Sequence, residues 1–425
     1  MSHCNNNAMN GFSVTISDRR RLDTLARRVA SLVPTEVNQE RVARCRALGR
    51  LQATAPVVYV DPETSWQEVL PESVLQCSTP LLRGWELQLL RRIVQFEQIG
   101  DDTPVEDFLN VPWVIDWGDW GVPLASHSVE AHGSYAIDPP LRNLDEDLSR
   151  LRHRVWRLDR AETEGRLALA QELVGAHLVA RPHNGTFWFG PSMPAMRMLG
   201  LEAFLMAMVD HPGQLHALMR FLADDYDQQL TSMEDAGALC AVSGAVKAGS
   251  GGLGYTDDLP SDDPRDPRYR RPLAAADIWG FGDSQETVGV SPDMFREFVL
   301  DYQAPVLRRC GLVAYGCCEP IHERIELLMA ALPNLRRVSI SPWTDQAVAA
   351  RKLGRRFIFS RKPNPSPLCV GFDEESLRRD VRETLRVAGD LNLEIIMKDV
   401  HTVQGDPSRL ARWVKLVREE IARHG

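Results

Sequence analysis

The last third of the chain alternates short apolar runs with stretches in which apolar residues recur every three or four positions. The apolar runs predict buried strands and the spaced patterns predict helices. The strands are expected at about 312–315, 336–340, 356–360 and 393–398, and the helices at about 320–332, 344–353, 374–389 and 407–423. Strand–helix units in succession predict parallel strands joined by right-handed crossovers.

Further strands are expected near residues 112, 177, 241 and 279, which brings the total to about eight. A doubly wound sheet fits the last four units equally well, but this larger total favours a (β/α)8 TIM barrel. The segment 13–110 is predicted to be a mostly helical N-terminal extension, and the polar, Asn-rich segment 1–12 is predicted to be disordered. The expected organisation is therefore a disordered N-terminus (1–12), a helical extension (13–110) and an α/β barrel (111–425).

Composition narrows the class of protein. The chain has 425 residues, a formal net charge of -9 and a pI of about 5.7, which argues against nucleic acid as a partner. Its eight cysteines include no CxxC pair, as expected for a reduced, cytoplasmic protein. The N-terminus lacks the apolar core of a signal peptide, and no apolar run approaches the roughly 20 residues of a membrane helix. We expect a protein without membrane contact. The oligomeric state is not predicted, and a homodimer is one possibility.

The stretch 311–322 is the strongest candidate for a site. An apolar strand ends at Tyr315 and is followed by Gly316, Cys317, Cys318 and Glu319 before the next helical pattern. In parallel α/β folds, active sites are built on the loops that follow strand ends. Thiolates and carboxylates are also zinc ligands, and a catalytic zinc keeps one position open.

Other residues with reactive or polar side chains also follow predicted strands. If the barrel forms, they converge on one mouth with the cysteines: His183, Asp283, Gln285, Glu286, Lys398, Asp399 and His401. Asp283 and Glu286 are the candidate catalytic carboxylates. Candidate substrate contacts are His183, Gln285, Tyr315, Lys398 and Asp399.

A zinc ion is expected on Cys317, Cys318, Glu319 and His401. Adjacent residues of a strand point to opposite faces, so both cysteines can bind one metal only if the backbone has already left the strand. The alternative is a pair of buried free thiols without a metal.

The segment 249–254 formally matches the dinucleotide fingerprint GxGxxG, but no helical pattern follows it. Its glycines and the Asp- and Pro-rich run that follows predict an exposed, mobile loop. We expect residues 249–272 to act as a lid over the site.

Residues 170–423 resemble the uroporphyrinogen decarboxylase superfamily, which includes zinc-dependent methyltransferases of corrinoid systems. The resemblance rests on 279–286 with 291–295, on 312–320 and on 397–409. It implies a (β/α)8 barrel and a zinc site with an HxC pair after one strand and a cysteine after the last strand. Here the HxC position reads Tyr315-Gly316-Cys317, which keeps the cysteine and loses the histidine, and the late cysteine position falls near His401.

The resemblance implies a zinc-dependent methyltransferase that moves a methyl group between a corrinoid protein or methylated substrate and a thiol or similar acceptor. Asp399-Val400-His401 to Gly405 is close to the corrinoid-binding DxHxxG pattern, but its glycine is one residue late, and the 20 residues after it are too few for the domain that surrounds that motif. A corrinoid would therefore be carried by a separate partner protein. The alternatives are a metal-independent decarboxylase or lyase of the uroporphyrinogen decarboxylase type, and a non-catalytic barrel that binds a partner or small ligand. The chain lacks the RQAGR-like stretch of the decarboxylases.

Overall fold

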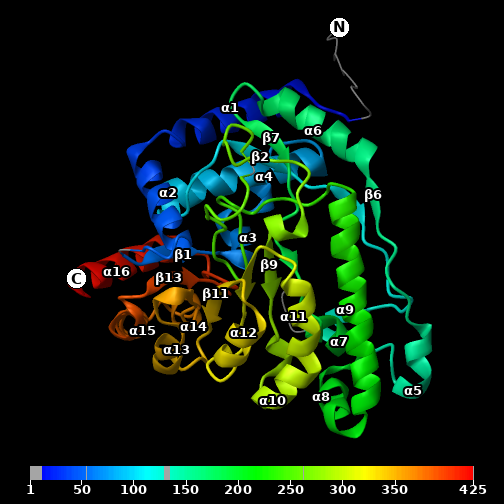
Figure 1. Cartoon of the computed structure of the whole chain (residues 1–425). Coiled ribbons are helices and arrows are strands. Elements are labelled where there is room, and N and C mark those ends of the chain that lie inside the picture. The colour runs from blue at the N-terminus through cyan, green and yellow to red at the C-terminus, as the bar shows by residue number, and fades with distance from the viewer. Residues whose placement is uncertain (1–11, 54, 129–134, 262, 425) are drawn as a thin grey trace.

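The structure is a computed structural model of the whole chain, and it describes residues 12–53, 55–128, 135–261 and 263–424 (Figure 1). The predicted disorder at the N-terminus falls mostly on residues 1–11, outside the described residues. The helices are α1 (Ile16–Leu32), α2 (Glu36–Gly49), α3 (Trp66–Val69), α4 (Pro80–Val94), α5 (Leu144–Asp147), α6 (Arg160–Val174), α7 (Ser192–Leu199), α8 (Leu201–Asp210), α9 (Pro212–Asp235), α10 (Pro292–Phe295), α11 (Asp301–Leu307), α12 (Ile325–Ala331), α13 (Gln346–Leu353), α14 (Ser366–Cys369), α15 (Glu374–Ala388) and α16 (Ser408–His424). The strands are β1 (Val57–Val60), β2 (Phe108–Val111), β3 (Val114–Asp116), β4 (Ser126–Ser128), β5 (Tyr135–Ile137), β6 (Arg157–Asp159), β7 (Val179–Pro182), β8 (Phe187–Trp188), β9 (Trp279–Gly282), β10 (Leu312–Tyr315), β11 (Leu335–Ile340), β12 (Ile358–Arg361) and β13 (Asn392–Met397).

Seven strands form one parallel sheet in the order β1-β13-β12-β11-β10-β9-β8. The predicted strand–helix rhythm after residue 311 is confirmed, because each expected strand there is present in this sheet and each expected helix follows it. β1 lies within the predicted helical extension, yet it pairs in parallel with β13, the last strand of the chain. The first and last parts of the chain therefore meet in the main sheet.

The remaining strands form two-stranded sheets: β2 with β7 in parallel, and β3 with β6 and β4 with β5 antiparallel. Among the described residues, no ladder joins β8 to the β2–β7 pair or that pair to β1. The chain is thus an α/β protein with a seven-stranded parallel sheet and N-terminal helices. The strand pairing does not show the closed eight-stranded barrel that was predicted, and closure stays a prediction. The strand predicted near residue 241 is wrong, since 238–246 carries no strand although 238–242 is buried.

The helices at the N-terminus begin where their sequences supply a cap. The Thr15 hydroxyl accepts the Asp18 N–H at the start of α1, and Thr79 followed by Pro80 begins α4 in the same way. α1 packs on α4 and on α6, and these helices gather at one end of the molecule (Figure 1). No single helix in the described part of the chain is long and apolar enough to cross a membrane, and the pair α7–α8 reaches that length only across a 99° bend.

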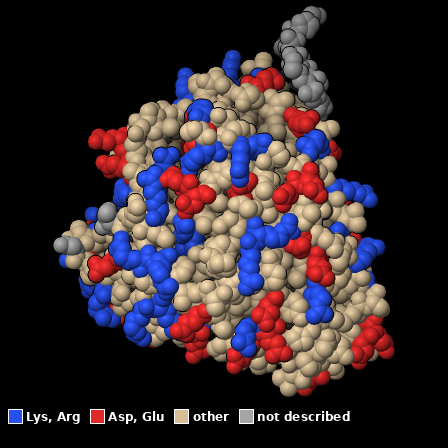
Figure 2. All heavy atoms as spheres, viewed as in Figure 1, with Lys and Arg blue, Asp and Glu red and all other residues tan. Residues whose placement is uncertain are grey.

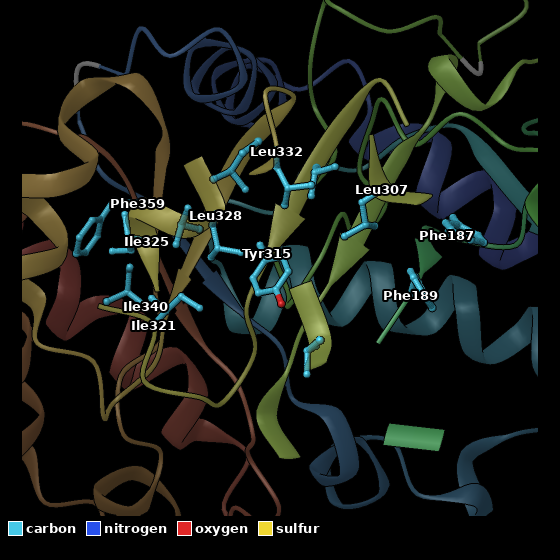
Figure 3. Close-up of a cluster of buried hydrophobic side chains, with 14 of the residues drawn as sticks. Phe187, Phe189, Leu307, Tyr315, Ile321, Ile325, Leu328, Leu332, Ile340 and Phe359 are labelled. Carbon is cyan, nitrogen blue, oxygen red and sulfur yellow. The ribbon is translucent and has the colours of Figure 1, made fainter. Parts of the chain in front are cut away.

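The two faces of the main sheet have different partners. On one face, strand residues such as Tyr315 and Ile340 join helix residues such as Ile325 and Leu328 in the largest hydrophobic core (Figure 3). The strands are covered on both faces, and all residues of β10 are buried, whereas β11 and β13 also carry buried polar residues such as Arg337 and Glu394. Basic and acidic side chains are intermixed over the outer surface seen in Figure 2.

The opposite face of the sheet packs against the chain at 247–255, here called the glycine loop. Arg337 of β11 donates to the carbonyl oxygens of Ala248 (2.9 Å) and Leu253 (2.8 Å), and Trp279 of β9 donates to that of Gly254 (3.2 Å). All of these hydrogen bonds are buried. Polar side chains of the strands therefore hold the glycine loop inside the curved sheet.

Glycine is required in this loop because the sheet side chains come so close. A Cβ at Gly252 would lie 2.6 Å from both Arg337 Nε and Glu394 Oε1, and one at Gly254 would lie 2.1 Å from the carbonyl oxygen of Val242. Residues 249–256 are buried or half-buried, so the predicted exposed loop is wrong for this half of 249–272, and the lid role stays a prediction. The glycines serve close packing, and sequence alone does not separate that role from flexibility.

Candidate functional site

Three chain segments meet around the thiol of Cys317. Cys317 follows β10, Lys398 follows β13, and Ser250 belongs to the glycine loop. Lys398 Nζ lies 3.9 Å from Cys317 Sγ, the Ser250 hydroxyl donates to the same sulfur at 3.6 Å, and Lys398 Nζ donates to Ser250 Oγ at 3.1 Å. β10 and β13 are three positions apart, which in a flat sheet is roughly 14 Å. The contact therefore reflects a strongly curved sheet whose strand ends converge.

Gly316 allows the two cysteines to point the same way. Its φ of +97° is in the left-handed region that favours glycine, so the backbone leaves the strand direction there. The Sγ atoms of Cys317 and Cys318 then lie 3.6 Å apart, and both residues are partly exposed. The backbone has therefore left the strand before the two cysteines, which is what both thiols need in order to bind one partner.

The surroundings favour a thiolate at Cys317. A hydrogen bond from Cys318, the positive charge of Lys398 and the Ser250 hydroxyl outweigh burial and lower the pKa of Cys317 to about 7. The same hydrogen bond raises the pKa of Cys318, which stays protonated as the donor. Burial works against the charged form of Lys398, but the negative charges of Cys317, Asp399 and Glu63 raise its pKa.

Glu319 is fully buried and acts as a clamp between two strand ends. Its Oε1 accepts the backbone N–H of Ser284 (2.9 Å) and the Ser284 hydroxyl (3.2 Å), while its Oε2 accepts the Cys317 N–H (2.9 Å). Arg324 completes the cluster by donating to Ser284 Oγ at 3.0 Å. Both oxygens of the carboxylate are therefore used inside the protein.

The predicted zinc ligands come together only in part. Cys317 and Cys318 are adjacent, but Glu319 is occupied by hydrogen bonds, and His401 is exposed with its Nδ1 3.3 Å from Thr64 Oγ1. Among the described residues, no group of three or more His, Cys, Asp or Glu side chains is placed to hold a metal ion. The arrangement does not fit the predicted four-residue zinc site, and zinc binding stays a prediction.

Asp283 and Glu286 follow β9 and are both buried. Asp283 Oδ1 accepts the indole N–H of Trp188 at 3.0 Å, and Glu286 Oε2 accepts the Ser192 hydroxyl at 2.7 Å. Burial, together with the charges of Glu319 and Cys317, raises the pKa of Asp283 well above its ordinary value, and burial raises that of Glu286. The shift is large only for Asp283, which therefore favours its protonated form near the thiolate. The neighbouring Gln285 is half-buried.

Two predicted substrate contacts are placed elsewhere. The Tyr315 side chain lies in the core on the helix-facing side of the sheet, where its hydroxyl donates to Gln303 Oε1 at 2.6 Å (Figure 3). His183 follows β7, outside the main sheet, and its Nδ1 accepts the Gly185 N–H at 2.9 Å. Burial lowers the pKa of His183 to about 3, so it is neutral.

Lys398 and Asp399 do lie at the site, with Lys398 Nζ 3.4 Å from Asp399 Oδ1 and 3.5 Å from Glu63 Oε1. Glu63 and Ser250 were missed. Glu63 follows β1 closely, so the strand-end rule applied to the 57–60 strand would have found it. Ser250 carries no such signal, because its position depends on how the glycine loop packs inside the sheet.

Comparisons with known proteins give the fold. No protein-family model matches the chain, and no curated protein matches it. A solved structure described as a methyltransferase from Methanosarcina mazei is similar, with a TM-score of 0.51 and 12% sequence identity over 90% of this chain and 99% of that chain. The chain therefore shares a fold with that methyltransferase along nearly its whole length, as the resemblance to the uroporphyrinogen decarboxylase superfamily implies.

Proposed function

We propose that this protein is a methyltransferase in which the Cys317 thiolate is the sulfur nucleophile. The observation that carries the proposal is the Cys317 sulfur, which has Lys398 Nζ at 3.9 Å and hydroxyl and thiol donors at 3.6 Å. Thiolates attack fastest when the pKa of the thiol is close to the ambient pH, and that of Cys317 is lowered to about 7. The shared fold with a methyltransferase supports the same reading.

In the proposed step, a lone pair of the Cys317 sulfur forms a bond to the methyl carbon of the donor. The bond between that carbon and the donor atom breaks, and its electron pair stays on the donor atom. Asp283, whose pKa is raised well above its ordinary value by burial and neighbouring charges, is a candidate to supply a proton to a basic leaving atom. The donor is a methylated small molecule or a methyl-corrinoid carried by a separate protein.

Zinc is a separate prediction within this proposal. Cys317 and Cys318 would supply two thiolates, the ligand type that zinc prefers, but the described side chains do not place a third ligand beside them. The step above is therefore written with the protein's own thiolate. Elemental analysis of protein purified without chelators measures the metal directly.

The decarboxylase alternative needs free cations to neutralise a polycarboxylate. Arg361 is buried and donates to Asp380 at 2.7 Å, and Lys362 is buried and donates to the Ser360 carbonyl oxygen at 3.1 Å. Lys398 faces the Cys317 sulfur. Because these cations already have partners, the site favours methyl transfer over decarboxylation.

The test is methylation of the purified protein with methylcobalamin as donor, followed by peptide mass spectrometry. We expect one methyl group on Cys317, no methylation at that position in Cys317→Ser, and normal methylation in Cys369→Ser, whose buried thiol belongs to the largest hydrophobic core. Demethylation of the cobalamin at an unchanged rate in Cys317→Ser would overturn the proposal.

A further inference from the structure

The main sheet ends at β1, and a cavity lies beyond that edge. Instead of a neighbouring strand, the carboxylates of Asp102 and Asp101 accept the backbone N–H groups of Val58 (2.9 Å) and Val60 (2.8 Å). A cavity of about 230 Å³ lies between the end of β1, helix α4, the approach to β2 and the glycine loop. The break in the sheet therefore leaves a space close to the strand ends.

Positively charged side chains outnumber negatively charged ones at the entrance of this cavity. Arg91 of α4 is exposed, and its guanidinium carbon lies 5.3 Å from the ring centroid of Trp66. In the part of the chain that the structure describes, no hydrogen bond or ion pair is made to the Arg91 guanidinium. Lys247 Nζ lies 2.5 Å from Asp61 Oδ2 and more than half of its side chain is exposed. Two cations and one carboxylate thus leave one excess positive charge at the entrance.

The other charged groups of the lining are already satisfied. Arg92 is fixed by the carbonyl oxygens of Phe108 and Glu106 and by Gln88 Oε1. Glu106 accepts the Tyr255 hydroxyl (3.1 Å) and the Ala245 N–H (3.0 Å). Arg91, held over Trp66, is therefore the group that is ready to receive an anion.

We propose that this cavity binds a small-molecule monocarboxylate. A guanidinium presents paired N–H donors that match a carboxylate, and the single excess charge suits a monoanion better than a dianion. Trp66, Val60 and Leu253 supply an apolar wall for the body of the ligand. Ligand pockets commonly combine such walls with a few polar groups that fix the orientation.

The cavity adjoins the thiolate through one residue of the glycine loop. Gly251 lines the cavity, and its neighbour Ser250 contacts both Cys317 Sγ and Lys398 Nζ. A carboxylate held at Arg91 leaves the body of the ligand in the space lined by Gly251, one residue from the Ser250 that contacts the thiolate. Resting on the proposed function, this makes the carboxylate the anchor of the small-molecule substrate in methyl transfer.

Calorimetric titration with benzoate tests the site, with neutral benzamide as the shape-matched probe. We expect benzoate to bind, benzamide to bind much more weakly, and Arg91→Gln to weaken benzoate binding by about tenfold or more. Arg83→Gln is the matched control, because Arg83 lies on the same helix but pairs with Glu72 at 3.1 Å. Equal affinities for benzoate and benzamide, or an unchanged affinity in Arg91→Gln with unaltered thermal unfolding, would overturn the site.

The link to the thiolate is measured separately from methylation. Bound benzoate should slow alkylation of Cys317 by iodoacetamide, and it should still bind to Cys317→Ser. Benzoate binding without protection of Cys317 would refute the anchoring role. Binding and protection in a protein that transfers no methyl group would leave the site standing and refute only the methyltransferase.

Discussion

Replacing Lys398 by methionine should raise the pKa of Cys317 and suppress its reactivity at neutral pH. The side chain is similar in length, so the packing around Ser250 is largely kept while the charge 3.9 Å from the sulfur is lost. A lowered thiol pKa means that the thiolate forms above about pH 7, so alkylation should increase as the pH rises through that value in the wild type. In Lys398→Met the increase should move to higher pH.

The magnitude follows from Coulomb's law. Two unit charges about 4 Å apart attract by about 4 kcal/mol at an effective dielectric constant of about 20, and one pH unit in a pKa corresponds to about 1.4 kcal/mol. The pair alone thus sets a ceiling of about three pH units. Glu63 and Asp399 lie 3.5 and 3.4 Å from the same ammonium and offset part of its charge, and Cys318 remains a donor. We expect a rise of about one to two pH units, each of which lowers the thiolate fraction at neutral pH about tenfold.

The assay is the rate of iodoacetamide alkylation against pH, with fragment mass spectra separating Cys317 from Cys318. Lys415→Met, which removes an exposed lysine from α16, is the matched control and should leave the profile unchanged. A Lys398→Met profile that coincides with the wild type would show that the hydrogen bond from Cys318 alone holds the thiolate. That result would refute the electrostatic reasoning behind the site.

Two further predictions concern stability, measured by urea unfolding. Glu319→Ala leaves buried N–H and O–H donors without an acceptor and should lower the free energy of unfolding by about 2–4 kcal/mol. Glu323→Ala, at an exposed position, is the control and should change the free energy of unfolding little. Equal effects of the two substitutions would contradict the role of Glu319 as a clamp. Gly254→Ala places a Cβ 2.1 Å from the Val242 carbonyl oxygen and should cost about 1–3 kcal/mol or more, while Gly213→Ala meets nothing within 4 Å and should be neutral or slightly stabilising. An unchanged free energy of unfolding in Gly254→Ala would mean that the backbone of the glycine loop shifts at little cost to make room for the Cβ.

The fold could be predicted best where apolar periodicity is strong and local. The strands and helices after residue 311 were predicted to within a few residues, because each strand there contains buried apolar residues and each helix has one apolar face. The prediction failed near residue 241, where the apolar run 238–242 is buried but carries no strand. Burial and strand formation leave the same pattern in the sequence, so periodicity does not separate them.

The candidate site could be predicted in part for a related reason. The rule that reactive side chains follow parallel strands found Cys317 and Lys398, and these lie together. The same rule does not say which way a side chain points after the strand ends. Glu319 turns inward to the Ser284 backbone and His401 turns outward toward Thr64, so the count of potential ligands in the sequence exceeded the number that converge.

The glycine loop connects the packed interior of the sheet with the candidate site around Cys317. Its glycines let the backbone lie against Arg337 and Glu394, and the same close approach places Ser250 against the Cys317 sulfur. A side chain at Gly252 would push the loop away from Arg337 and Glu394 of the sheet and would withdraw Ser250 from the thiol. The Ser250 contact with Cys317 therefore depends on the close packing at Gly252, and a Gly252→Ala protein should show a higher pKa of Cys317. The packing of the sheet interior and the reactivity of the Cys317 thiol are therefore expected to change together.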